Sequence, residues 1–133
     1  MKKQFKLIVL IVGAIGAMVL LFFIGSLVFI QHDVKQICAE AKQAYQLDCV
    51  DSLVSYASSE EHSYRKRNKA IWALGQIADR DAVPFLMSLS RQVEKKKRYD
   101  LNEELSAYEI NKALRWCTQG SSVSWMYLNR NQW

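Results

Sequence analysis

Residues 67–86, which read RNKAIWALGQIADRDAVPFL, decide the fold of this chain. Apolar side chains recur at helical spacing before Asp79 and again after Asp81, so the stretch predicts two helices joined by a very short turn. Asp81 is expected to accept hydrogen bonds from the free amides of the second helix. Pro84 falls in the first turn of that helix, where a missing N–H costs little. The stretch therefore predicts an antiparallel helical hairpin in an all-α protein.

A repeat extends this pattern in both directions. The sequence D-x-V-x-x-L-x-S begins at Asp48 and again at Asp81. Each copy is expected to open a helix, and a second helix follows it, over residues 64–78 in the first unit and about 101–117 in the second. The sequence therefore predicts two helix pairs in succession.

Residues 73–86 also resemble a known family. They read A-L-G-Q-I-A-D-x-x-A-V-P-x-L, which is similar to the core of the HEAT-like repeat first associated with phycobilisome lyases. The resemblance is good across residues 48–90 and weaker to residue 117. It implies a short right-handed solenoid of about two helical-hairpin repeats that serves protein recognition. A lyase-like or lyase-assisting role would rest on analogy of fold alone, because the repeat does not carry that chemistry.

The N-terminal segment has a different composition. Residues 7–30 contain no charged side chain, and as a helix they can cross a hydrocarbon layer of about 30 Å at roughly 1.5 Å per residue. Lys2, Lys3 and Lys6 precede them without an acidic residue, so the positive-inside rule favours a cytoplasmic N-terminus. A cleaved signal peptide is the competing interpretation, although its apolar stretch is usually only about 7–15 residues. We expect a single-pass signal-anchor in the cell membrane, with the helical domain outside the cytoplasm.

These features divide the chain into four expected segments. They are a transmembrane anchor at 1–31, a connecting or capping helix at 32–47, the HEAT-like domain at 48–117 and an aromatic tail at 118–133. Two repeats are few for a stable stack, which normally has about three. The helix at 32–47 can cover the first unit, and the tail can fold over the last one; otherwise a partner supplies the missing surface.

The helix expected at 64–78 carries the candidate partner-binding surface. Its apolar stripe is expected to face the core, and the opposite side holds Arg65, Asn68, Lys69, Trp72 and Gln76. Trp and Arg are favoured at recognition hot spots. Two interpretations of Trp72 stay open, since it either contacts a partner or packs under the preceding helix of the stack.

Arg67 lies nearer the buried side of the same helix. We expect it to have a structural role, in which it pairs with Asp79 or Asp81 at the turns. In the HEAT-like pattern an Arg and an Asp play this part between repeats, so the resemblance supports the same expectation.

Two further stretches suggest contacts outside the domain. Gly13 and Ala17 are four residues apart and would let two membrane helices approach closely, which predicts an alternative role as a structural subunit of a larger membrane complex, homo- or hetero-oligomeric. A basic run at Lys95, Lys96, Lys97 and Arg98 could meet an anionic surface. Outside the cytoplasm, nucleic acid is not an expected partner.

The three cysteines, Cys38, Cys49 and Cys117, do not predict a particular pairing. The first two lie at unequal distances from the turn near Leu47, so a close approach of their α-carbons is not expected. Cys49 and Cys117 are expected at the same end of the stack, one unit apart. Buried small apolar residues are the simplest interpretation of all three.

No constellation of catalytic residues stands out in the sequence. The two histidines are isolated, and there is no nucleophile elbow, phosphate loop or zinc signature. We therefore expect no enzymatic activity, no cofactor and no metal. The chain is interpreted as a membrane-anchored protein-interaction or assembly scaffold.

Overall fold

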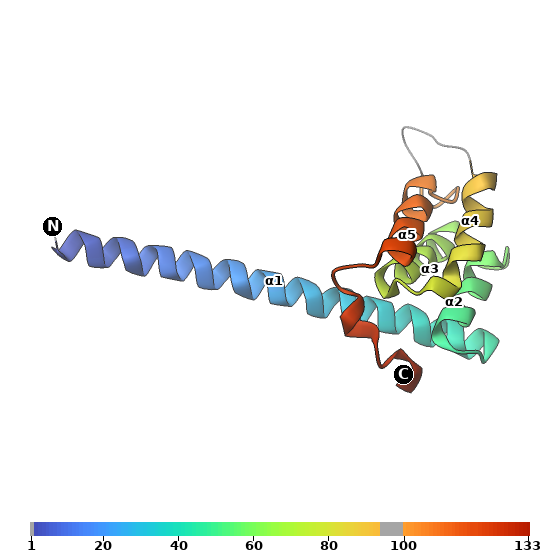
Figure 1. Ribbon diagram of the computed structural model, residues 1–133, viewed down its shortest axis with the longest axis horizontal. Coiled ribbons are helices and arrows are strands. Elements are labelled where there is room, and N and C mark those ends of the chain that lie inside the picture. Colours follow the sequence, from blue (N-terminus) through green and yellow to red (C-terminus); the bar gives the residue numbers. More distant parts are fainter. Residues whose placement is uncertain (1, 94–99) are drawn as a thin grey trace. The chain divides into compact units, whose positions relative to one another are not determined.

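The computed structural model describes residues 2–93 and 100–133, and every regular element in these ranges is helical. The elements, shown in Figure 1, are α1 (Lys2–Tyr45), α2 (Cys49–Ser58), α3 (Tyr64–Ile77), the 3₁₀ turn η1 (Arg80–Ala82), α4 (Val83–Gln92), α5 (Ala107–Gln119), and the 3₁₀ turns η2 (Ser124–Tyr127) and η3 (Arg130–Gln132). The predicted all-α class is confirmed. The basic run Lys95, Lys96, Lys97 and Arg98 lies outside the described residues.

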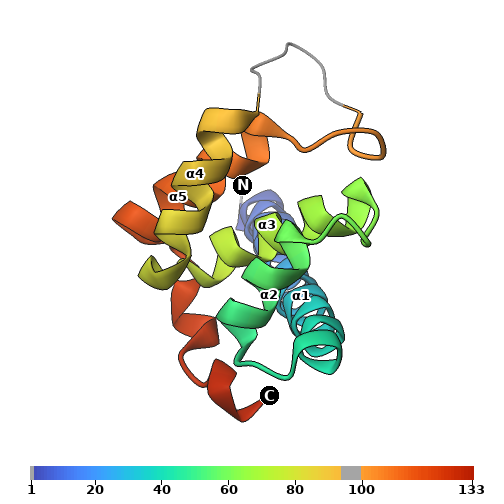
Figure 2. The same cartoon turned by 90° about the vertical axis from the view of Figure 1, so that its right-hand side faces the viewer.

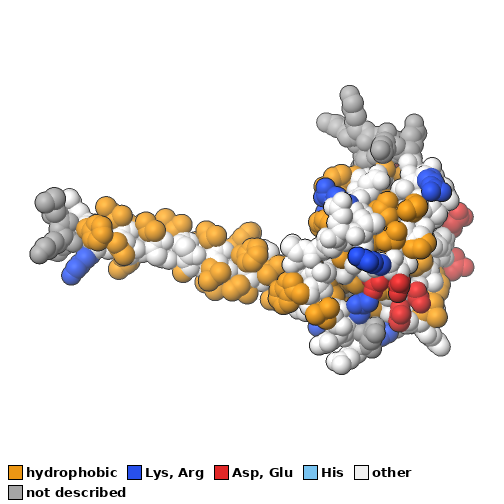
Figure 3. Space-filling model, viewed as in Figure 1, with side chains coloured by type: hydrophobic (Ala, Val, Ile, Leu, Met, Phe, Trp, Pro, Cys, Tyr) orange, Lys and Arg blue, Asp and Glu red, His pale blue; other side chains and the backbone are white. Residues whose placement is uncertain are grey.

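The chain divides into two compact units, residues 1–33 and residues 34–133. The first unit consists of the N-terminal part of α1, whose large apolar side chains are exposed along its length (Figure 3). Its most apolar window has a mean hydropathy of 3.1, and 0% of that window is buried. Among the described residues, this is the one helix long and apolar enough to cross a membrane; a signal sequence has the same character.

In the second unit, α3 is the central helix. It packs against α2 and against α5, and α4 packs on α5 (Figure 2). The prediction that α3 and α4 form a hairpin is therefore wrong, because the two helices follow one another through η1 but pack mainly on other helices. Helices that are consecutive in the chain pack in two pairs, α2 with α3 and α4 with α5, and α3 also packs against α5. The two consecutive pairs are the two repeats that the D-x-V-x-x-L-x-S pattern predicts.

The core of this unit is close-packed where α3 crosses α5. A Cβ added at Gly75 would lie 2.9 Å from the Cα of Ala113, so the two helix backbones meet with no room for a side chain between them. The side chains expected on the apolar stripe of α3 are all buried, and so are large side chains from the other helices. They are Ala70, Ala73, Leu74 and Ile77 on α3, with Ile37, Leu53, Leu86 and Ile110 around them.

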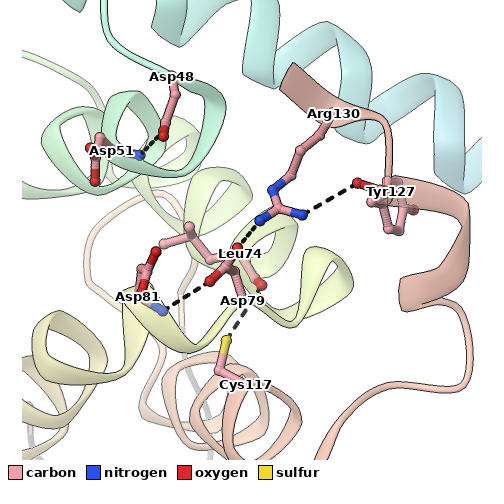
Figure 4. Close-up of polar contacts among 8 residues, drawn as sticks. All are labelled: Asp48, Asp51, Leu74, Asp79, Asp81, Cys117, Tyr127 and Arg130. Atoms are coloured by element: carbon pink, nitrogen blue, oxygen red, sulfur yellow. Dashed lines mark hydrogen bonds and ion pairs between the residues drawn. The ribbon is translucent and has the colours of Figure 1, made fainter. Parts of the chain in front are cut away.

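Asp79, rather than Asp81, caps the turn between α3 and α4. Its carboxylate accepts a hydrogen bond from the amide of Asp81 at 2.9 Å (Figure 4). The prediction for Asp81 is wrong because η1 precedes α4, so the first free amides lie earlier in the chain than a direct start of α4 would place them. Asp48 caps α2 by accepting from the amide of Asp51 at 2.9 Å, and Pro84 lies in the first turn of α4 as predicted.

The helix α5 begins later than the sequence predicts. Residues 101–104 form a turn, which starts where the carboxylate of Asp100 accepts a hydrogen bond from the amide of Asn102 at 2.9 Å. Such a local side-chain bond competes with helix formation. The cap is provided by Ser106, whose hydroxyl accepts from the amide of Glu109 at 3.2 Å.

Cys38 and Cys49 form a disulfide, with their α-carbons 5.4 Å apart. The prediction that these two cysteines would not meet, which was based on their unequal distances from the turn near Leu47, is wrong. Cys38 lies seven residues, or about 10 Å, before the last residue of α1. The connection at 46–48 can span about that distance, and it brings α2 back to begin beside Cys38. Cys117 is a buried free thiol.

The C-terminal tail, residues 121–133, packs back onto the second unit. Tyr127 is fully buried, and its ring meets the ring of Trp133 edge to face with centroids 5.9 Å apart. The ammonium of Lys35 lies 5.0 Å from the centre of the Trp133 ring, and Lys42 donates to the backbone oxygen of Trp133. The expectation that the tail covers the last repeat, α4 with α5, is corrected, because these contacts hold the tail against the C-terminal part of α1.

Candidate partner-binding face

The predicted face of α3 is only partly open. Arg65 is exposed, and Lys69 and Trp72 are partly buried. Asn68 and Gln76 are only 4% and 5% exposed, so the expectation that they face solvent is wrong. A helical wheel shows one helix alone, whereas α3 is flanked by α2, α5 and the tail element η2. The accessible part of the face is therefore reduced to Arg65, Lys69 and Trp72, which we call the α3 face.

Asn68 fastens the loop before α5 to the centre of the domain. Its Nδ2 donates to the carbonyl oxygens of Leu101 at 3.2 Å and Glu104 at 2.8 Å, and its Oδ1 accepts from the amide of Ser106 at 2.9 Å. One carboxamide thus satisfies three backbone groups of a segment that is not helical. Asn68 has a structural role, and it also fixes the residue that caps α5.

Arg67 does not pair with either aspartate. Its Nε donates to the carbonyl oxygen of Ala57 at 2.9 Å, and its guanidinium lies 5.4 Å from the centre of the Tyr64 ring. The prediction of a structural role for Arg67 fits these contacts, but the expected partner was wrong. Because the carbonyl belongs to the end of α2, Arg67 joins the two helices of the first repeat at the connection between them.

Asp79 binds an arginine from the tail instead. The guanidinium of Arg130 forms an ion pair with the Asp79 carboxylate, and it also donates to the carbonyl oxygen of Tyr127 at 3.5 Å (Figure 4). Cys117 lies nearby, where its thiol donates to the carbonyl oxygen of Leu74 at 3.5 Å. Burial, and then the charge of Asp79, raise the pKa of the Cys117 thiol to about 12, so this thiol stays protonated and is structural.

A polar and aromatic cluster joins α1, α2 and the start of α3. Tyr56 donates to the Glu40 carboxylate at 2.6 Å, and Lys66 pairs with the same carboxylate at 2.5 Å. The ring of His62 stacks on Tyr56 with centroids 3.6 Å apart, and Tyr45 is 3.2 Å from the Nε2 atom of His62. No local sequence pattern indicates this cluster, because its members come from three helices and the connection between two of them.

The cluster shifts the pKa values of three of its titratable groups, and the hydrogen bond to Glu40 raises that of Lys66. The hydrogen bond from Lys66, followed by the one from Tyr56, lowers the pKa of Glu40 below its usual value. Burial, and then the hydrogen bond to Glu40, raise the pKa of Tyr56. At neutral pH the carboxylate is therefore ionised and the phenol is neutral, which is the pairing that the geometry requires.

An open pocket lies beside this cluster, at the N-terminal end of α3. It has a volume of about 570 Å³ and is lined by residues 60–64, Arg67 and Asn102. Its lining is mostly polar, and both glutamates of the connection between α2 and α3 contribute to it. Within the described part of the chain, no group of three His, Cys, Asp or Glu side chains is placed to hold a metal ion. We assign the pocket no ligand.

The predicted membrane contact residues lie in the first unit. Gly13 has no neighbouring atom within 4 Å of an added Cβ, and Ala17 is exposed on the same helix. Both are thus accessible to another helix as far as the described residues of this unit are concerned.

Comparison with known proteins identifies one feature of the chain. Residues 66–92 match the family model of the PBS lyase HEAT-like repeat, a segment that covers α3 from its first turn, η1 and α4. Comparisons with curated proteins and with solved structures gave no match. The matched segment includes Lys69 and Trp72 of the α3 face and the whole of the turn that Asp79 caps. The chain thus carries a PBS lyase HEAT-like repeat over residues 66–92.

Proposed function

We propose that this protein is a membrane-anchored, non-enzymatic interaction module whose helical domain binds a protein partner through the α3 face. The HEAT-like repeat carries the proposal, because stacked helix pairs of this kind present extended surfaces for protein recognition. The apolar helix α1 would hold the domain at the membrane.

The α3 face has the chemistry of a recognition surface. Arg65, Lys69 and Trp72 are spaced i, i+4 and i+7, so their side chains follow one side of the helix. An indole provides a large apolar area together with one N–H donor, and it is among the side chains most often found at hot spots. The first turn of α3 contains no acidic residue. A partner segment with acidic and apolar side chains would therefore complement the face.

The disulfide supports an extracytoplasmic position for the domain. Intramolecular disulfides form and persist in oxidising compartments and are rare in the cytosol. The Cys38–Cys49 bond lies after the apolar stretch, and Lys2, Lys3 and Lys6 lie before it. Both features favour a cytoplasmic N-terminus and a domain on the outer side of the cell membrane.

Site-specific photo-crosslinking in intact cells tests the binding role. A photo-reactive residue replaces Trp72 in one variant and Ala17 in another, and crosslinked proteins are identified by mass spectrometry. A third variant carries it at Trp116, a matched control because this indole is also partly buried but lies on α5, where Lys112 covers its ring at 4.8 Å. One defined protein captured from position 72 and not from position 116 would support the proposal.

Two other outcomes of this experiment contradict the proposed face. Capture from position 17 alone would assign the main contact to the membrane helix, and the protein would then be a structural subunit of a membrane complex. Equal capture from positions 72 and 116 would mean that the α3 face has no special role.

Cysteine labelling in intact cells tests the topology separately. The native cysteines are either in the disulfide or buried, so labelling by a maleimide should report on an added, exposed cysteine. With Thr118→Cys, an exposed site on α5, a membrane-impermeant maleimide should react before the cells are opened. With Lys6→Cys it should react only afterwards. The reverse order would refute the orientation, and loss of an N-terminal tag from the mature protein would identify a cleaved signal sequence.

A further inference from the structure

Trp125 and Leu128 are large apolar side chains that the folded domain leaves in solvent. They are 63% and 75% exposed. They are three residues apart on η2 and its C-cap, and side chains at i and i+3 eclipse one another in a 3₁₀ helix, so both project from one side of the turn. Tyr127 lies on the other side and is fully buried. The turn is therefore fixed on its inner side and apolar on its outer side.

The contacts of the tail set the position of this apolar pair. Tyr127 contacts the ring of Trp133, and that ring lies 5.0 Å from the ammonium of Lys35. Lys35 follows Ile30, the last residue of the apolar stretch, by five positions. Even a fully extended chain would then place Lys35 no more than about 18 Å beyond that stretch. Two side-chain contacts thus connect the exposed pair to a residue that must stay near the end of the apolar segment.

We propose that the C-terminal tail is a second membrane contact, in which Trp125 and Leu128 enter the interfacial layer of the bilayer that α1 crosses. This inference depends on the proposed membrane anchoring by α1. Tryptophan concentrates in the interfacial layer, because its ring is apolar and its N–H can still bond to headgroups and water. Lys35 carries the charge that suits an anionic headgroup at the same depth. The tail would orient the domain against the membrane surface, in addition to the single covalent link.

Quenching of tryptophan fluorescence by brominated lipid tests the contact. The full chain is reconstituted in vesicles of phosphatidylcholine and phosphatidylglycerol whose acyl chains carry bromine near the headgroup. The emission of Trp125 is obtained as the difference between the wild-type chain and Trp125→Phe. The matched control is the double variant Trp125→Phe, Tyr108→Trp, because Tyr108 is also 63% exposed but lies on α5. Circular dichroism checks that each variant is folded.

The expected result is that lipid bromination reduces the emission from position 125 at least about twofold more than the emission from position 108. Leu128→Ser should then weaken the quenching at position 125, because the apolar pair enters the layer together. Equal quenching at the two positions would overturn the inference.

Vesicle flotation after an alkaline wash separates this result from a failure of the anchor. If the chain does not float with the vesicles, membrane anchoring by α1 is wrong, and the tail contact falls with it. If the chain floats while position 125 stays unquenched, the anchor stands and the tail contact is refuted, so that Trp125 and Leu128 face water or another protein.

Discussion

Replacing Asn68 by alanine should destabilise the domain far more than is usual for an asparagine substitution. The side chain makes hydrogen bonds to Leu101, Glu104 and Ser106, and it is 4% exposed. Each such bond contributes about 1 kcal/mol net, and a buried group left without a partner costs about 1–3 kcal/mol. Alanine recovers about 0.5 kcal/mol through its higher helix propensity. The expected loss for Asn68→Ala is therefore about 2–3 kcal/mol.

The assay combines urea denaturation with hydrogen exchange, both on the full chain in detergent micelles. Denaturation gives the change in the free energy of unfolding. Exchange read by mass spectrometry gives the location, and peptides covering residues 101–110 should lose protection, because the amide of Ser106 donates to Asn68 and Ser106 caps α5. Protection of the amides in α2 should change less, because the hydrogen bonds of Asn68 hold the loop before α5 and not α2.

Asn111→Ala is the matched control. Asn111 is an exposed asparagine on α5 whose Nδ2 donates to the carbonyl oxygen of Ala107 at 2.8 Å, within the same helix. Its removal should change stability by no more than about 0.5 kcal/mol, because water can replace the bond and alanine favours the helix. If Asn68→Ala costs no more than Asn111→Ala, the carboxamide does not fasten the loop, and the reasoning is refuted.

Asn68→Asp tests the donor role of Nδ2 separately, because aspartate has nearly the same shape as asparagine. The carboxylate can still accept from Ser106, but it faces the carbonyl oxygens of Leu101 and Glu104 with no donor. We expect a loss at neutral pH at least as large as that of Asn68→Ala, and a partial recovery in acid, where the protonated carboxyl regains one donor. A variant as stable as wild type at pH 7 would contradict the donor role of Nδ2.

Three further predictions concern the packing and charge of the same domain. Gly75→Ala should lower the free energy of unfolding by about 1–2 kcal/mol despite its higher helix propensity, because the new methyl group meets the backbone of Ala113; calorimetry that shows stabilisation would contradict this. Opening the Cys38–Cys49 bond, which has a sequence separation of 11, should cost about 3 kcal/mol, and an unchanged melting temperature after reduction would disprove the estimate. Hydrogen bonds lower the pKa of Glu40 in the folded protein, so its carboxylate should add to the free energy of unfolding at pH values above the pKa of Glu40 in the unfolded chain, and this stabilisation should be lost as the pH falls through the lower folded pKa. Glu40→Gln should therefore reduce the loss of stability in acid. If the plots of stability against pH for the variant and the wild type run parallel in acid, Glu40 makes no such contribution.

Some parts of the candidate site could be predicted from local patterns. The repeated D-x-V-x-x-L-x-S sequence predicts the starts of two helices, and Asp48 does cap the first of them. The apolar stripe of α3 follows from its spacing, and Trp72 and Lys69 keep part of their surface accessible. These features depend on one helix and its immediate neighbours in the chain, so periodicity and capping rules are enough.

Other parts could not be predicted, because they depend on which helices become neighbours. Asn68 looked like a surface residue, since nothing in the sequence shows that the loop at 101–106 returns to it from more than thirty positions away. The predicted pairing of Arg67 with Asp79 or Asp81 is wrong for the same reason, because Arg67 bonds to Ala57 and the residue that binds Asp79 is Arg130 in the tail.

The sequence by itself determined that this protein has an apolar N-terminal helix followed by all-helical repeats, because hydrophobic period, caps and charge distribution are local properties of the chain. Only the tertiary structure decided that α3 packs between α2 and α5, that Cys38 joins Cys49, and that the tail returns to Lys35. Each of these depends on long-range packing, in which a buried polar group must find a partner wherever the folded chain provides one.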